Sequence, residues 1–259
     1  MDLLRHLRFE SDRFADVLRY ADPGLPVPTC PEWTAGDLLW HLAEVQWFWT
    51  TVVRDHATPA GLTRPDRPAD HRRLLAFFEE TSHLLSGVLS AHRPDEPTWT
   101  WSDDHTVGFV IRRQAHEALI HRVDAEVTTG TSSPMDTELC VDGVDETLRV
   151  MYGVLPSWAT FTAEPAKTVR LRATDTGDTW FLTLGRFTGT DPDGGRTYDD
   201  PDFEVAPADP GDTAAAELAA TVADLDRWLW RRPAEGDLHR EGDEDVLGHF
   251  EAAIAEGIR

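Results

Sequence analysis

The stretch that decides the fold of the first half runs from residue 34 to residue 52 and reads TAGDLLWHLAEVQWFWTTV. Thr34 opens it and Asp37 follows three residues later, a spacing typical of a helix N-terminus because the two side chains can bind free backbone N–H groups there. Its apolar residues then recur at alternating spacings of four and three: Leu38, Leu42, Val45, Trp49 and Val52. This pattern predicts a long helix that buries one face.

Three more helices are expected around this one. Apolar stripes with helical spacing cover residues 3–20, 70–92 and 106–127. Pro94 ends the second of these segments, and Thr106 is in position to cap the third. The sequence Gly-Thr-Ser-Ser-Pro at 130–134 then has the composition of a linker. Four helices with modest connections make an all-α four-helix bundle the expected fold of residues 1–130.

Residues 136–259 have a different pattern, which predicts a small α+β domain. The expected elements are, in chain order, a helix over 136–150, strands over 167–174 and 180–184 joined by a turn at 175–178, an exposed loop over 190–202, and a helix from 213 to about 232 capped by Asp212. The strands are expected because apolar and polar side chains alternate there. The loop is expected because the segment holds five aspartates together with Gly and Pro.

The charge of the chain excludes several classes of partner. There are 47 acidic and 24 basic residues, which gives a formal net charge of −23. Binding to nucleic acid or to an anionic membrane surface requires clustered Lys and Arg, so neither is expected. No apolar run approaches the roughly 18 residues that a membrane span needs, and the N-terminus lacks the apolar region of a signal peptide. We therefore expect a soluble, cytoplasmic protein.

Histidines are concentrated in the first half, where nine of the eleven precede residue 122. Glu117 and His121 lie four residues apart on the fourth expected helix, so both project from one face. His41 lies on the apolar face of the helix over 34–52, and inward His and Glu side chains on facing helices are how bundles build metal sites. The spacing alone leaves two interpretations open, a metal site or a salt bridge beside a core histidine.

Three neighbours of this trio are candidates for a supporting role. Asp124 lies one turn beyond His121, and it and Glu44 are candidate hydrogen-bond partners that would orient the histidines. Arg113 lies one turn before Glu117; it is expected either to neutralise an acidic substrate or to form a salt bridge with Glu117. Trp99 and Trp101, on the loop before the fourth helix, are expected either to roof a pocket or to pack.

Three motifs in this order resemble the mycothiol-dependent maleylpyruvate isomerase family. They are Cys30-Pro31-Glu32-Trp33-Thr34 with the following Asp37–Leu42, the segment Arg112–Glu126, and Trp228-Leu229-Trp230-Arg231-Arg232. The resemblance implies a DinB-like metal-binding bundle followed by a sterol-carrier-like α+β domain. It also implies a divalent metal, usually zinc, held by His41, Glu117 and His121, and a catalytic arginine at Arg232. The family commonly has glycine before that arginine, where this chain has Arg231.

The same resemblance implies a chemistry. Two imidazoles and a carboxylate suit zinc with one position open, and a thiol bound there loses its proton. The resulting metal-bound thiolate of mycothiol would isomerise or S-conjugate a small electrophilic molecule. Two alternatives stay open: a metal-dependent hydrolase on the same scaffold, and a non-catalytic protein that binds metal or a small molecule.

Overall fold

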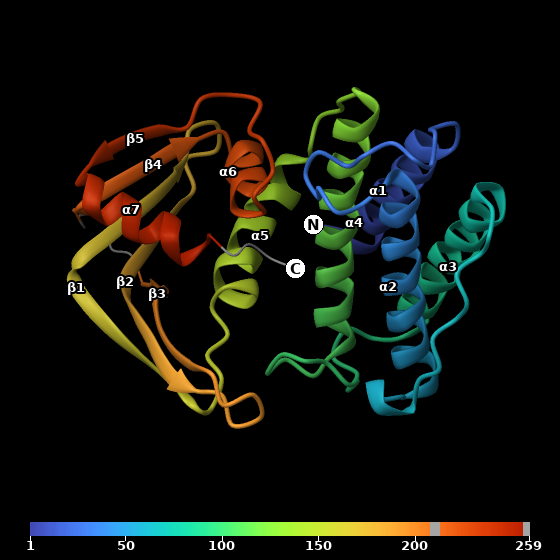
Figure 1. Cartoon of the computed structure of the whole chain (residues 1–259), viewed down its shortest axis with the longest axis horizontal. Helices are drawn as coiled ribbons and strands as arrows, with labels where there is room; N and C mark the ends of the chain where they lie inside the picture. Colours follow the sequence, from blue (N-terminus) through green and yellow to red (C-terminus); the bar gives the residue numbers. More distant parts are fainter. Residues whose placement is uncertain (208–212, 256–259) are drawn as a thin grey trace. The chain divides into compact units, whose positions relative to one another are not determined.

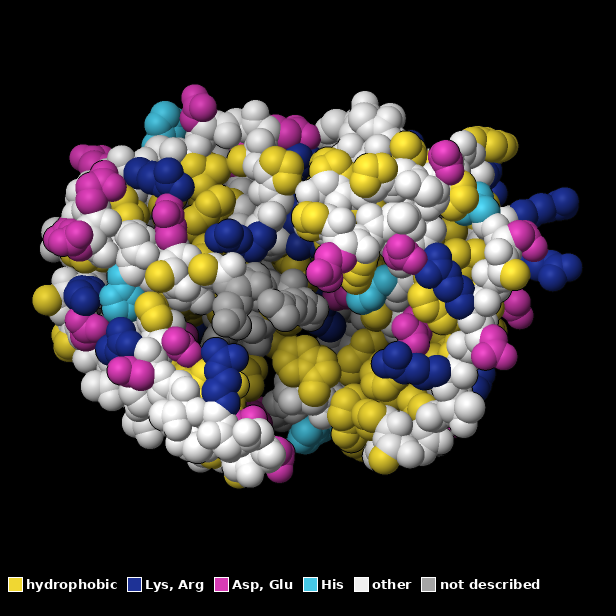
Figure 2. Space-filling view, viewed as in Figure 1, with side chains coloured by type: hydrophobic (Ala, Val, Ile, Leu, Met, Phe, Trp, Pro, Cys, Tyr) yellow, Lys and Arg dark blue, Asp and Glu magenta, His cyan; other side chains and the backbone are white. Residues whose placement is uncertain are grey.

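The structure, a computed structural model, describes residues 1–207 and 213–255. The chain divides into two compact units, Met1–Met135 and Asp136–Arg259 (Figure 1). On the face shown in Figure 2, acidic and basic side chains are interspersed over the surface of each unit. None of the described helices combines the length and the apolarity that crossing a bilayer requires.

The first unit is helical, as predicted. Its elements are α1 (Leu3–Leu18), α2 (Ala35–Asp55), the short 3₁₀ turn η1 (Pro59–Gly61), α3 (His71–Ala91) and α4 (Val107–Thr129). Thr34 and Asp37 form the expected capping box at the start of α2, and the Thr106 side chain accepts a hydrogen bond from the first turn of α4. Helix α4 ends at Gly130, whose φ of 69° lies in the left-handed region that glycine adopts without strain.

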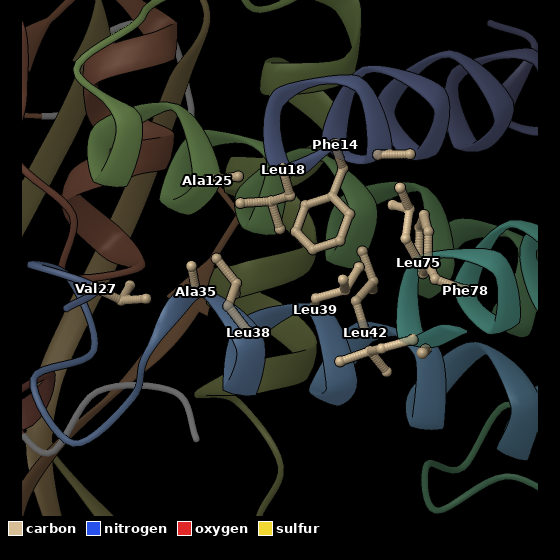
Figure 3. Packing of buried hydrophobic residues seen from close by; sticks show 13 residues of the cluster. Phe14, Leu18, Val27, Ala35, Leu38, Leu39, Leu42, Leu75, Phe78 and Ala125 are labelled. Atoms are coloured by element: carbon tan, nitrogen blue, oxygen red, sulfur yellow. The ribbon is translucent and has the colours of Figure 1, made fainter. Parts of the chain in front are cut away.

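The apolar faces of these helices meet in a common core (Figure 3). Phe14 and Leu18 of α1 pack there with Leu39 and Leu42 of α2 and Phe78 of α3, and all five side chains are buried. The Phe14 and Phe78 rings lie 5.1 Å apart at a tilted angle that suits aromatic packing. The core therefore holds α2 in one orientation relative to its neighbours, which fixes the direction of the side chains on its other faces.

A buried ionic cluster joins α4 to α1 and to the segment after α4. We call it the Arg122 cluster: Glu10, Arg122, Glu126 and Ser133. The Arg122 guanidinium donates to Glu10 Oε2 at 2.8 Å, to Glu126 Oε2 at 2.8 Å and to the carbonyl oxygen of Ser133 at 3.1 Å. Burial raises the pKa of Glu10, although the arginine opposes that shift, whereas hydrogen bonds to Ser133 and Arg122 outweigh burial and lower the pKa of Glu126.

The second unit is built on a mixed sheet in which five described strands have the order β3-β2-β1-β4-β5. Its elements are α5 (Thr137–Glu146), the π-helical turn η2 (Thr147–Met151), β1 (Ala159–Ala173), β2 (Thr179–Thr190), β3 (Thr197–Ala206), β4 (Ala216–Ala220), α6 (Val222–Leu229), β5 (His239–Gly242) and α7 (Glu244–Ala253). Strand β1 pairs antiparallel with β2 and parallel with β4. Helix α7 packs on the sheet, where the Phe250 ring meets that of Phe203 at 5.3 Å.

Two expectations for this unit were wrong. Residues 197–202 of the predicted loop over 190–202 belong to β3, which lies at the edge of the described sheet; its aspartates are tolerated because one side of the strand pairs with no described strand. The predicted helix from 213 to 232 is instead strand β4 followed by the short helix α6, because the alanine-rich segment pairs in register with β1 and is mostly buried there. Asp212, its expected cap, lies outside the described residues.

Candidate metal centre

Helices α2 and α4 place three potential metal ligands together. His41 projects from α2, and Glu117 and His121 project from α4, one turn apart. One ligand atom from each of these residues lies within 4.8 Å of the others. We call them the metal triad. The sequence predicted these same three residues, and the contact between α2 and α4 brings them together.

The two imidazoles converge on one carboxylate oxygen. His121 Nε2 lies 3.2 Å from Glu117 Oε1, and His41 Nε2 lies 3.5 Å from the same atom. The imidazole rings of His41 and His121 have centroids 4.8 Å apart and meet edge to face. His121 is buried and Glu117 nearly so, whereas the His41 side chain is 30% exposed. The triad is therefore closed on the α4 side and accessible beside His41.

Opposing effects set the charge of the two α4 residues. Burial disfavours the charged form of Glu117, but hydrogen bonds with His121 and His41 and the nearby Arg113 hold its pKa well below its usual value. Burial likewise disfavours the His121 imidazolium, but Asp124 and Glu117 outweigh that penalty and raise the pKa of His121. The site therefore favours the ionised form of Glu117 and the positively charged form of His121.

Asp124 has the position expected of a residue that orients a ligand. Its side chain is fully buried, and its Oδ2 accepts a hydrogen bond from His121 Nδ1 at 3.0 Å. A histidine that donates through Nδ1 presents the lone pair of Nε2 to a metal, and carboxylates commonly serve as such partners. The Nε2 atom is the one that faces Glu117.

The donor atoms of the triad fit a zinc-type cation. A tetrahedral centre with ligand bonds of about 2.0–2.2 Å separates its ligand atoms by roughly 3.3–3.6 Å. The two distances to Glu117 Oε1, 3.2 and 3.5 Å, are close to that separation. Two imidazole nitrogens and one carboxylate oxygen are also a donor set that zinc uses when its fourth position is open.

Arg113 and Glu44, the other two predicted neighbours of the triad, both form ion pairs. Arg113 is buried, and its Nη2 lies 3.4 Å from Glu117 Oε2, so the salt bridge is the arrangement that the structure contains. Glu44 forms an ion pair with Arg64 at 3.2 Å. It lines a pocket next to His41.

Trp33 lies against the triad, although no separate role was predicted for it from the sequence. Its ring lies 4.7 Å from the His41 ring and 6.3 Å from the His121 ring, between centroids. It lies directly before the Thr34 cap of α2, so the turn that starts the helix also brings the indole over the triad. An aromatic ring against both imidazoles restricts their rotation. The sequence feature that could have indicated this position is that Trp33 directly precedes the helix cap at Thr34.

A pocket of about 420 Å³ adjoins His41. Trp47, Phe48 and Trp49 of α2 line it together with Leu62 and Trp101, and we call it the aromatic pocket. Nothing in the sequence predicted that Trp47 and Trp49 line a pocket. Of the two loop tryptophans, Trp101 lines the pocket. Trp99 is stacked against Trp49 instead, with centroids 6.1 Å apart.

Comparison with known proteins found one matching family model and two similar solved structures. Residues 4–126 match the family model of the mycothiol maleylpyruvate isomerase N-terminal domain. The matched segment covers most of the helical unit. No curated protein matches the sequence.

Two solved structures share the fold of the whole chain. They are crystal structures of the mycothiol-dependent maleylpyruvate isomerase and of a histidine-to-alanine mutant of it, with TM-scores of 0.58 and 0.59. Each is 12% identical to this chain, and each alignment covers 93% of this chain and 92% of the other. The second unit therefore also has a counterpart in these structures, although the family model ends at residue 126.

The predicted arginine lies in the second unit, just after α6. Arg232 is 9% exposed, and its Nη1 donates to the Trp230 carbonyl oxygen at 2.6 Å. Arg231, directly before it, has a φ of 62°, in the left-handed region. A family that commonly places glycine before its arginine would meet the demand of such a backbone without strain.

Proposed function

We propose that this protein is a divalent-metal-dependent enzyme, with zinc as its metal, that uses mycothiol to isomerise or S-conjugate a small electrophilic molecule. The observation that carries the proposal is the convergence of His41, Glu117 and His121 within 4.8 Å. The match of residues 4–126 to a domain family of mycothiol enzymes supports the choice of thiol. On this account the helical unit is a DinB-like bundle, the second unit is sterol-carrier-like, and the enzyme acts in the cytoplasm.

The chain's own residues have distinct parts in this proposal. His41, Glu117 and His121 would hold the metal, which when bound lowers the pKa of a coordinated thiol and so supplies a nucleophile at neutral pH. Asp124 keeps the His121 ring in the orientation that directs Nε2 at Glu117. Arg113 pairs with Glu117 and keeps that carboxylate ionised, and Glu44 lines the entry beside His41.

We assign the catalytic arginine to Arg232, in which role its guanidinium stabilises the negative charge that develops on the acceptor as sulfur adds to it. The left-handed backbone of Arg231 supports this register. Replacing Arg231 with Gly should leave activity intact and stabilise the protein by roughly 1 kcal/mol, because glycine adopts that conformation without strain. Replacing Arg232 with Gln should lower activity and leave metal content unchanged. Loss of activity in Arg231→Gly with retention in Arg232→Gln would reverse the assignment.

The direct test measures metal content and thiol dependence together. We expect about one zinc per chain in the full-length protein and consumption of a small model electrophile only when mycothiol is present. His41→Ala and His121→Ala should lose both properties, whereas His83→Ala, which replaces an exposed histidine on α3, should lose neither. Turnover in buffer without thiol would favour a hydrolase, and bound metal without turnover a binding protein. Absence of metal would refute the proposal.

A further inference from the structure

We infer that the acceptor substrate is a neutral, electron-poor alkene that carries an aromatic ring, and that its ring binds in the aromatic pocket. This inference rests on the proposed function, because it names the substrate class of the same site. It separates this protein from an enzyme whose acceptor is a small dicarboxylate such as maleylpyruvate. The shape, charge and rigidity of the pocket and its position beside His41 support it.

The pocket has the size and surface of a site for a small aromatic molecule. Its volume of about 420 Å³ lies within the range of small-molecule pockets, roughly 300–1,000 Å³. Trp47, Phe48, Trp49 and Trp101 supply aromatic walls, and Leu62 adds an aliphatic one. Aromatic rings stack on such walls or meet them edge to face, with a gain beyond simple burial.

The charges around the pocket disfavour an anionic substrate. Among the described lining residues, Arg64 is the only arginine or lysine, and it is already paired with Glu44 at 3.2 Å. The Arg64 side chain is also 81% exposed, so water screens its charge. Apart from the proposed metal beside His41, these lining side chains therefore offer a dicarboxylate only a cation that is already paired, and Glu44 adds a negative charge.

Ring-to-ring contacts with neighbouring aromatic residues support the walls of the aromatic pocket. The Phe48 ring lies 5.0 Å from that of Trp49, and Trp99 stacks on Trp49 at 6.1 Å. Across the pocket, the Trp101 ring meets the Phe109 ring of α4 edge to face at 5.3 Å. Since the walls are ordered before a ligand arrives, binding does not have to order them.

His41 connects the pocket to the chemistry, because it belongs to both the metal triad and the pocket lining. A ring seated in the pocket places the attached alkene next to the thiol. The sulfur lone pair forms a C–S bond with one alkene carbon, and the π pair moves to the other. That carbon either takes the proton that the thiol released, which gives the S-conjugate, or expels the sulfur after rotation, which gives the isomer. Neither route needs an oxidant or a reductant.

The test compares the binding of two probes by calorimetry, using the zinc-loaded full-length protein without thiol. The neutral probe is 4-phenyl-3-buten-2-one, and the anionic probe is maleate. We expect the neutral probe to bind at least about tenfold more tightly, which is what one good aromatic contact contributes. Tighter binding of maleate, or no binding of the neutral probe, would overturn the inference. Because thiol is absent, this result does not depend on turnover.

Two variants test whether the neutral probe binds in the aromatic pocket. Leu62→Arg adds a cation to the pocket and should weaken the neutral probe and strengthen maleate, whereas Leu84→Arg, which adds the same charge at an exposed position on α3, should change neither. Trp101→Ala removes a wall that is 43% exposed and should weaken the neutral probe by several-fold without loss of the fold. Unchanged affinities in both pocket variants would place the probe elsewhere and contradict the inference. If the neutral probe binds as expected but mycothiol does not react with it, the proposed function fails and the binding site stands.

Discussion

Helix α4 carries two clusters of ionisable side chains that are built in opposite ways. In the Arg122 cluster, a buried guanidinium lies between Glu10 and Glu126, and Ser133 bonds to both Arg122 and Glu126. In the metal triad, whose Glu117 lies about one helical turn before Arg122 on α4, two imidazole nitrogens converge on a single carboxylate oxygen. The first cluster contains its own cation. The second arranges donor atoms around a place where a cation fits.

On the proposed function, this difference separates a structural cluster from a metal-binding one on the same helix. Buried charges are tolerated when partners and hydrogen bonds satisfy them, and the Arg122 cluster meets that condition with residues of the chain alone. On the proposed function, a bound metal ion would satisfy the charges of the metal triad, which stays accessible at His41. The comparison predicts that mutations in the first cluster change stability, and that mutations in the second change metal binding.

The largest effect is expected from Arg122→Met. It removes the buried cation that pairs with both Glu10 and Glu126, so the free energy of unfolding should fall by about 3–5 kcal/mol. Urea denaturation of the metal-free protein measures this. Arg13→Met is the matched control, because Arg13 pairs with the same Glu126 but is 37% exposed and should contribute about 1 kcal/mol or less. Equal losses in the two variants would show that burial of the cluster does not matter.

Zinc should stabilise the wild-type protein by about 4 kcal/mol when its free concentration is about 1,000 times its dissociation constant. Denaturation with and without zinc measures the increment. His41→Ala should lose it while its metal-free stability stays close to that of the wild type, since His41 is partly exposed. An equal zinc increment in His41→Ala would place the metal outside the triad.

Asp124→Asn tests the support of the triad, with a smaller expected effect. Loss of the carboxylate that accepts from His121 Nδ1 should weaken zinc binding by about 10–100-fold. Competition with a fluorescent chelator measures the affinity. Asp145→Asn, which removes a partly exposed ion pair with Arg149 in the second unit, is the control and should leave zinc affinity unchanged. A zinc affinity of Asp124→Asn equal to that of the wild type would remove Asp124 from the account.

The smallest effect is a dependence on pH carried by the Arg122 cluster. The folded protein lowers the pKa of Glu126 below its ordinary value of 4.5, so this carboxylate stabilises the fold above that pH. The stabilisation should be lost as pH falls below 4.5 and through the lowered pKa. Glu10, with a raised pKa, acts in the opposite direction and offsets part of the loss. Glu126→Gln should flatten the acid side of the stability curve, and an unchanged acid limb would contradict this assignment.

The helical spacing predicted which faces carry His41, Glu117 and His121, but it left a metal site and a salt bridge both open, and the ligand set followed only from the family resemblance. Glu117 and His121 are four apart, and the apolar pattern of α2 turns His41 inward. The capping box at Thr34 and Asp37 was equally local. Asp124 followed from the same periodicity.

Contacts between distant segments were not predictable in this way. The aromatic pocket depends on how the loop carrying Trp101 meets α2, and no periodicity encodes that meeting. Glu44 pairs with Arg64, twenty residues away on an irregular segment. Strand β4 has an alanine-rich sequence that suits a helix, and its pairing with β1 overrides that preference.

X-ray absorption at the zinc edge, before and after addition of mycothiol, tests the central claim most directly. Before addition, we predict a first shell of nitrogen and oxygen atoms only, from His41, Glu117 and His121. After addition, one sulfur atom should join it at about 2.3 Å. A first shell that gains no sulfur, in a protein saturated with thiol, would contradict the account of this site.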